Sequence, residues 1–281
     1  INSNISLVST IGKDVEGKII KKILNNKNID LNFKQVDDCY TIKKLRIFSN
    51  HHQMIRLDFE SKKEKYKIKI DSKLKKKINN HKLILISDYE KGSLIEVRKI
   101  IDYAKFKSKL IIVDPKGNDF SKYKDASILT PNIYEFTRIV GIIKNKSMLI
   151  KKARDLIKKN NLIGLLITQG KNGMTFVSKD KVIHKNSLVQ DVYDVTGAGD
   201  TVVAIFSAYL NLGKTYEESM VMANIAASIV IKKIGTSTAT KKEIDEIYKL
   251  KNKEINKKKF FVSTSDIIQK VKSIKKNKKI V

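Results

Sequence analysis

The seven residues Asp194-Val-Thr-Gly-Ala-Gly-Asp200 carry the strongest chemical pattern in the sequence, and the apolar stretch 201–212, typical of a helix, follows them. Gly197 and Gly199 have no Cβ atoms, so the backbone can approach an anion closely, and the first N–H groups of the helix point toward it. Asp200 would then lie beside an anion cradle, where a carboxylate can accept a proton from a hydroxyl that attacks a phosphoryl group. The pattern therefore indicates phosphoryl transfer, and the alternative is a helix N-cap whose glycines serve packing.

A second polar motif, Asn132-Ile-Tyr-Glu135, follows Pro131. The carboxylate of Glu135 can hold a metal-bound water, and the amide of Asn132 can bind a phosphate oxygen. An asparagine with a glutamate three positions later also makes an ordinary helix N-terminus. The sequence leaves both interpretations open.

The glycine pattern differs from two common nucleotide sites. Gly199 is not followed directly by Lys-Ser or Lys-Thr, so the pattern is not a P-loop. The sequence also has no His-Arg-Asp and no Asp-Phe-Gly motif, which excludes the protein-kinase set.

The elements that must position these motifs show a regular alternation. Four short apolar runs are typical of buried strands: 83–86, 110–113, 127–130 and 162–167. Helical segments separate them, among them 93–107 and a helix after Pro131. Continuously apolar strands separated by helices predict an α/β fold, with a mostly parallel sheet and helices on both faces.

Other segments surround this sheet. We expect strands at 5–10, 41–49 and 53–59, helices after Asp14 and at 61–82, a hairpin at 173–185, two helices within 199–234, and a terminal helix plus linker at 241–279. Apolar residues alternate along 41–49 and 53–59, so one face of this pair is expected to be exposed or to cover a site.

The composition limits the classes of partner. Lys and Arg total 58 against 29 Asp and Glu, a formal net charge of +29, but only five of the 58 are arginines. Arginine is the residue that reads phosphates and bases with two hydrogen bonds, so the excess of lysine does not indicate specific nucleic-acid binding. The longest strongly apolar stretch, 202–212, is too short to span a bilayer. The single cysteine, Cys39, excludes an internal disulfide and fits a reducing, cytoplasmic compartment.

The glycine motif resembles the C-terminal signature of the ribokinase-like (PfkB) sugar kinases. Further segments resemble that family in the same order: 130–135, Thr168 to Gly173, and Asn224. The resemblance implies a ribokinase-like fold with a small β lid, ATP and Mg²⁺ as cofactors, Asp200 as the catalytic base, and Glu135 as a metal residue acting through water. It assigns ATP binding to Asn132, Ile133, Tyr134, Glu135, Thr168, Gly170, Gly173, Gly197, Ala198, Gly199 and Asn224.

Other segments resemble the branch of this family that phosphorylates heptose 7-phosphate during lipopolysaccharide synthesis. They are 53–60, 86–92, 113–117, 192–196 and 234–238. The branch implies a sugar-phosphate substrate, phosphorylated at C1, and the family places the segment of Arg56 over the sugar. Lys91 and Lys116 follow strands at their carboxyl ends, where open α/β sheets bind ligands, so both are candidate contacts of the sugar phosphate or of the ATP phosphates. A kinase of the same fold for another sugar, such as fructose 1-phosphate or ribose, and an inactive remnant stay as alternatives.

The resemblance also predicts the organisation of the chain. We expect a kinase domain over 1–250, with lid strands at about 41–60, and a helical linker over 251–281 that leads toward an adenylyltransferase half of a multifunctional enzyme. Family members begin with a strand that carries a sugar-binding aspartate and with a Gly-Gly segment, neither of which this sequence contains. The family also suggests a homodimer.

Overall fold

The computed structural model describes residues 4–25, 27, 29–49, 52–188, 196–233 and 235–260, and the side chains of residues 48 and 251–260 are outside this description. The first part of the glycine motif, 194–195, and the expected linker beyond residue 260 therefore lie outside the described residues.

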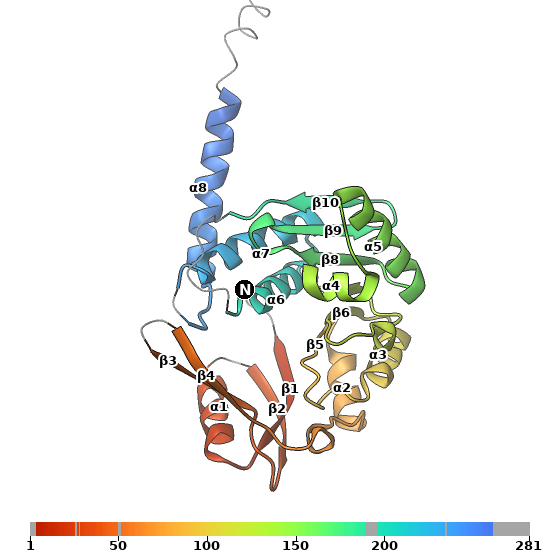
Figure 1. Ribbon diagram of the computed structural model, residues 1–281, viewed down its shortest axis with the longest axis vertical. Helices are drawn as coiled ribbons and strands as arrows, with labels where there is room; N and C mark the ends of the chain where they lie inside the picture. The colour runs from red at the N-terminus through yellow and green to blue at the C-terminus, as the bar shows by residue number, and fades with distance from the viewer. Residues whose placement is uncertain are drawn as a thin grey trace, which may run out of the picture.

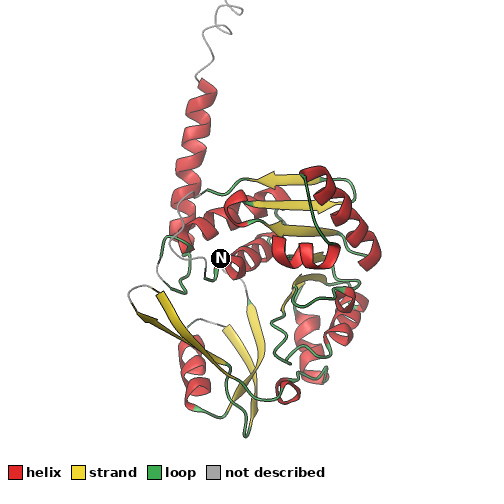
Figure 2. Ribbon diagram, viewed as in Figure 1, coloured by secondary structure: helices red, strands yellow, loops and turns green. Residues whose placement is uncertain are grey.

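A six-stranded sheet forms the centre of the molecule (Figures 1 and 2). Its strand order is β10-β9-β8-β7-β6-β5. Four strands are parallel: β5 (Leu83–Ser87), β6 (Leu110–Asp114), β7 (Ile128–Leu129) and β8 (Gly164–Thr168). The hairpin of β9 (Met174–Ser178) and β10 (Val182–Lys185) extends the sheet in antiparallel fashion. The predicted apolar strands are therefore confirmed, with boundaries shifted by one or two residues.

Helices cover both faces of this sheet (Figure 2). Ile111 and Val113 of β6 face one core, whereas Ile112 between them faces the other, because successive side chains of a strand point to opposite sides. The first core is closed by α2 (Ser72–Asn80), α3 (Val97–Phe106), α4 (Ile133–Val140) and α5 (Lys146–Asn160). The second core is closed by α6 (Ala198–Asn211) and α7 (Tyr216–Val230).

The N-terminal part forms a separate two-stranded parallel sheet. Strand β1 (Ile5–Gly12), helix α1 (Val15–Asn25) and strand β2 (Ile29–Val36) make one βαβ unit. Strand β2 was not predicted, although its apolar residues Ile29, Leu31 and Phe33 alternate with polar ones in the pattern of a half-buried strand. Among the described residues, β1 pairs with β2 alone and β5 pairs with β6 alone, so each keeps one unpaired edge.

The third sheet is the antiparallel hairpin of β3 (Lys43–Ser49) and β4 (His52–Phe59), which agrees with the predicted pair of strands. In register, Leu45 lies opposite Leu57 and Ile47 opposite Ile55, so these apolar side chains share one face. All four are exposed to solvent. The opposite face, called the polar face below, carries four charged residues: Lys44, Arg46, Arg56 and Asp58.

The predicted helix over 61–82 is wrong over its first half. The structure has a short 3₁₀ turn, η1 (Lys63–Tyr66), and a helix only from Ser72 to Asn80. The reason is Tyr66, whose side chain is buried and whose hydroxyl donates to the carbonyl of Tyr40 and accepts from the N–H of Ser61. These contacts hold the segment in a non-helical path.

Helix α8 (Lys241–Phe260) leaves the body of the molecule (Figure 1). Its first turn is anchored by Ile244, which is buried against α7 and neighbouring residues. Within the described part of the chain, no helix combines the length and the apolar character needed to cross a membrane.

Candidate active site

Helix α6 begins at the glycine turn. Gly197 has φ of +78°, a left-handed conformation that favours glycine, and Thr201 caps the turn by donating its hydroxyl to the carbonyl of Gly197 at 2.8 Å. A Cβ atom built on Gly197 or Gly199 would have no atom within 4 Å. The space above the first N–H groups of α6 is therefore open, which is the geometry of an anion site at a helix N-terminus.

Asp200 lies in the first turn of α6 and is exposed. Its Oδ1 accepts a hydrogen bond of 2.5 Å from the hydroxyl of Tyr89, which follows β5 and is 111 residues away in the chain. The carboxylate is thus both accessible and oriented, as a base that meets an incoming hydroxyl must be.

Asp114 ends β6 and brings a second carboxyl group to the same region. The pKa of Asp114 is raised from 3.8 to about 7, mainly by burial and then by the negative charges of Glu135 and Asp200, whereas a hydrogen bond from Thr130 lowers it. The Thr130 hydroxyl lies 3.3 Å from Oδ1 of Asp114. The charges of acidic side chains in α4 and α6 therefore both act on the carboxyl group that ends β6.

The motif at 132–135 forms an ordinary helix N-terminus in the structure, which is the alternative to a binding motif. Asn132 caps α4 by accepting from the N–H of Glu135 at 2.9 Å, and Glu135 Oε2 accepts from the N–H of Asn132 at 3.0 Å. Glu135 Oε1 also accepts a charged hydrogen bond of 2.7 Å from Lys116. Of the two residues between Asn132 and Glu135, Ile133 packs against the core, whereas Tyr134 is 80% exposed.

The remaining residues of the predicted nucleotide site come from two places. Thr168 ends β8, forms a parallel bridge to Asn132 and donates its N–H to Pro131 at 3.1 Å, which joins these two segments directly. Asn224, in α7, is buried and donates from Nδ2 to the carbonyl of Asn186 at 2.7 Å. Within the described residues, the hydrogen bonds of Asn224 and Asp200 lead to different partners, Asn186 and Tyr89.

The two glycines of the 168–173 turn differ in what they require. Gly173 has φ of +82°, and a Cβ atom there would stand 1.9 Å from the carbonyl oxygen of Lys185. Gly170 has open space above it. Gly173 is therefore required by the close approach of β10, independently of any ligand.

The candidate sugar contacts lie around the β3–β4 hairpin and the loop after β5. Lys91 forms an ion pair with Glu60, at the end of β4. Arg56 pairs with Asp58 at 2.8 Å on the same strand, and it shares the polar face of the hairpin with Lys44. Lys44 lies over the ring of Tyr89, 5.8 Å from its centroid, so the polar face is the one that looks toward Asp200.

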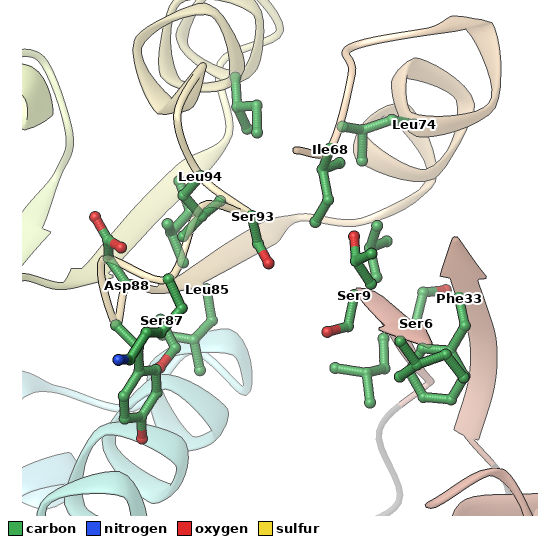
Figure 3. Close-up of a pocket in the computed structure, with 18 of the residues that line it drawn as sticks. Ser6, Ser9, Phe33, Ile68, Leu74, Leu85, Ser87, Asp88, Ser93 and Leu94 are labelled. Carbon is green, nitrogen blue, oxygen red and sulfur yellow. The ribbon is translucent and has the colours of Figure 1, made fainter. Parts of the chain in front are cut away.

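A cavity of about 570 Å³ lies between the unpaired edges of β1 and β5 (Figure 3). Residues 6–11 line it from β1, and residues 83–88 line it from β5. Figure 3 shows Ser6, Ser9 and Phe33 on one side and Leu85, Ser87 and Asp88 on the other. Tyr89, Lys44 and Lys91 also line the cavity, so it opens toward the side chain that contacts Asp200.

The described residues contain no group of three His, Cys, Asp or Glu side chains close enough to hold a metal ion by themselves. Mg²⁺ is commonly bound by one or two carboxylates together with substrate phosphates. The acidic residues around Asp114 fit that use, because burial and then the charges of Glu135 and Asp200 raise the pKa of Asp114, and a cation would offset that repulsion.

Sequence reasoning missed two residues of this site, Tyr89 and Asp114. Both lie at or just after the carboxyl end of a parallel strand, where open α/β sheets bind ligands. That rule, which pointed to Lys91 and Lys116, would also have identified them.

Comparison with known proteins identifies the family to which the chain is similar. The model of the pfkB family of carbohydrate kinases matches residues 2–243. The bifunctional protein HldE of Blochmanniella pennsylvanica is 45% identical over 247 residues, which cover 86% of this chain and 51% of that protein. The chain thus spans about half the length of the HldE relatives it matches. An uncharacterized sugar kinase of Buchnera aphidicola subsp. Schizaphis graminum is 41% identical over 250 residues, covering 88% of this chain and 79% of that protein.

Solved structures give the same fold. Arabidopsis thaliana ribokinase, complexed with ribose and ATP, superposes with a TM-score of 0.77 at 20% identity, over 86% of this chain and 81% of that chain. Escherichia coli phosphofructokinase-2, in complex with potassium, gives a TM-score of 0.71 at 16% identity, over 89% of this chain and 82% of that chain. The predicted ribokinase-like α/β fold is confirmed.

Proposed function

The chain belongs to the pfkB family of carbohydrate kinases, and from that premise we propose that it transfers the terminal phosphoryl group of ATP to the C1 hydroxyl of a heptose 7-phosphate, giving the 1,7-bisphosphate. The observation that carries this proposal is the exposed, oriented carboxylate of Asp200 in the first turn of α6, directly beside the open glycine turn. The branch-specific segments 86–92 and 113–117 favour the heptose substrate over another sugar.

In this proposal each group has a separate task. Asp200 takes the proton of the attacking hydroxyl, and the N–H groups at Gly197 to Gly199 stabilise negative charge on the transferring phosphoryl group. A hydroxyl at the anomeric carbon is more acidic than an ordinary alcohol, which eases proton removal. Asn132, Thr168 and Asn224 would bind the nucleotide, together with the neighbouring positions that the resemblance assigns.

Mg²⁺ would neutralise charge on the ATP phosphates. Glu135 would hold it through water, and the charges of Glu135 and Asp200 both act on Asp114. Oε1 of Glu135 accepts from Lys116, so this lysine lies beside the carboxylate and would also contact the phosphates. The substrate's own phosphate would bind near Lys91 and Arg56, at the side of the cavity that Tyr89 lines.

Gly199→Ala tests the anion cradle. A methyl group at this position meets no protein atom but enters the space assigned to the phosphates, so we expect the KM for ATP to rise about tenfold or more. The melting temperature should stay or rise, because alanine is favoured over glycine in a helix by about 0.5–1 kcal/mol. Steady-state kinetics and thermal unfolding measure the two effects.

Gly213→Ala is the matched control at the other end of α6. Gly213 has φ of +77°, so alanine is strained there and should cost about 1–2 kcal/mol of stability while the KM for ATP is unchanged. An unchanged KM in Gly199→Ala would remove the glycine turn from the ATP site.

We further propose a homodimer formed through the apolar face of the β3–β4 hairpin. Leu45, Ile47, Ile55 and Leu57 are each 38–46% exposed on that face, and a second copy would bury them. Leu57→Glu should give a monomer in sedimentation velocity at concentrations where the parent protein is dimeric. Arg46→Ala, on the polar face, is the control and should stay dimeric, and a dimer in Leu57→Glu would contradict this interface.

The same premise extends to the rest of the chain. We propose that residues 251–281 connect the kinase domain of 1–250 to an adenylyltransferase half, as the bifunctional name of the HldE relatives suggests. We place the reaction in the cytoplasm, where ATP is available and where the lone Cys39 stays reduced.

A further inference from the structure

Tyr89 contacts the proposed base directly. Its hydroxyl lies 2.5 Å from Oδ1 of Asp200. Burial raises the pKa of the Tyr89 phenol, and the hydrogen bond and charge of Asp200 raise it further. The phenol therefore stays protonated at neutral pH, so it is the donor and the carboxylate is the acceptor.

The backbone on both sides of Tyr89 is fixed. Asp88 is buried, donates its N–H to the carbonyl of Asp114 at 3.0 Å, and accepts from the N–H of Glu90 at 2.8 Å. The carboxylate of Asp88 also accepts from the hydroxyl of Tyr123 at 2.6 Å and from Lys122 at 3.0 Å. This network anchors the loop to the carboxyl end of β5, so the backbone that carries Tyr89 is held in place.

The β3–β4 hairpin reaches the same loop at two points. Lys44 of β3 lies over the Tyr89 ring, 5.8 Å from its centroid, in the arrangement of a cation–π contact. Glu60, directly after β4, pairs with Lys91, two residues beyond Tyr89. Tyr89 therefore stands between the hairpin and Asp200.

We propose that Tyr89 is a positioning residue for Asp200: its hydroxyl holds one carboxylate oxygen and so presents the other to the sugar hydroxyl, while Lys44 ties Tyr89 to the hairpin. A carboxylate on an exposed helix turn otherwise rotates freely, and fixing its orientation places it for attack before substrate arrives. This inference rests on the proposed function of Asp200. Tyr89 itself exchanges no proton with the substrate.

Tyr89→Phe tests the inference in the protein expressed from its complete reading frame, with heptose 7-phosphate and MgATP. The phenyl ring keeps the contact with Lys44 and removes the hydroxyl alone. Because the variant loses a hydrogen bond to a charged group, we expect kcat to fall about tenfold or more, with the KM for ATP unchanged within about twofold. Tyr103→Phe is the matched control and should keep parental kinetics, since it removes a hydroxyl of α3 that donates to Asn79 of α2.

A double variant separates positioning from general structural damage. In the Asp200→Asn background, Tyr89→Phe should cause no further loss of kcat, because the group it positions is no longer a base. A kcat that is unchanged in Tyr89→Phe, a loss that adds fully to that of Asp200→Asn, or a loss accompanied by a lower melting temperature and a higher KM for ATP would each overturn the inference. An inactive parent protein would instead refute the proposed function.

The contact can also be measured without activity. With tyrosine labelled at Cζ with ¹³C, the Tyr89 resonance is identified by its absence in Tyr89→Phe. It should shift on Asp200→Asn at neutral pH, whereas the Tyr103 resonance should not. A Tyr89 resonance that ignores Asp200→Asn would overturn the inference even if the enzyme is active.

Discussion

Asp200→Asn is expected to reduce kcat by about 10²–10⁴-fold while leaving the affinity for ATP within a few-fold of the parent protein. The amide cannot accept the proton of the sugar hydroxyl, so the chemical step loses its base. ATP binding should survive because the proposed cradle at Gly197 to Gly199 consists of backbone N–H groups, and the removal of a nearby negative charge does not weaken an anion site.

The measurement is heptose 7-phosphate-dependent release of ADP, with a nucleotide titration in parallel. Asp180→Asn, in the exposed turn between β9 and β10, is the matched control and should keep parental turnover. Near-normal turnover in Asp200→Asn would make Asp200 a structural residue of the α6 N-terminus and would contradict the proposed mechanism.

Asp114→Asn is expected to stabilise the protein above pH 7 and to have little effect below about pH 4. The pKa of Asp114 is raised from 3.8 to about 7, mainly by burial and then by Glu135 and Asp200. Between these values the folded state keeps a proton that the unfolded state releases, so the stability of the parent protein falls as pH rises through this window. Each pKa unit corresponds to about 1.4 kcal/mol, which puts the gain from asparagine on the order of 2–4 kcal/mol above pH 7.

Denaturant unfolding at a series of pH values measures this effect. Asp119→Asn is the matched control, because hydrogen bonds from Ser121 lower the pKa of Asp119 and give its ionised form the opposite influence on stability. That control should show no gain between pH 4 and 7. A stability difference between Asp114→Asn and the parent that does not depend on pH would show that Asp114 is ionised throughout.

The central sheet could be predicted from sequence because its strands carry their own signal. Runs such as Leu110 to Val113 are apolar at every position, and the structure buries both faces of that strand. Strand β2 lacks a continuous apolar run, because Asp30, Asn32 and Lys34 alternate with apolar residues, and this weaker period-two signal was overlooked. The failed helix at 61–82 has a different origin, because a distant contact, Tyr66 with Tyr40, overrides local helix preference.

The same distinction between local sequence and distant contacts applies to the site. The glycine turn and Asp200 are contiguous in sequence, so their chemistry could be inferred from spacing. The approach of Tyr89 to Asp200 spans 111 residues, and its presence depends on where β5 and α6 meet. The structure uses Asn132 and Glu135 as a helix cap, which is one of the two interpretations that the sequence left open, and their binding of phosphate and metal stays a prediction.

The sequence by itself determined the α/β class, the position of the glycine turn and the type of reaction, because strand hydrophobicity, the absence of a Cβ atom and the basicity of a carboxylate are properties of single residues and their neighbours in the chain. The tertiary structure decided which acidic groups share one region, which hydroxyl holds Asp200, and that the pKa of Asp114 is raised. Burial and Coulomb interactions act through space, so their strength depends on distances that exist only after the strands have been placed side by side.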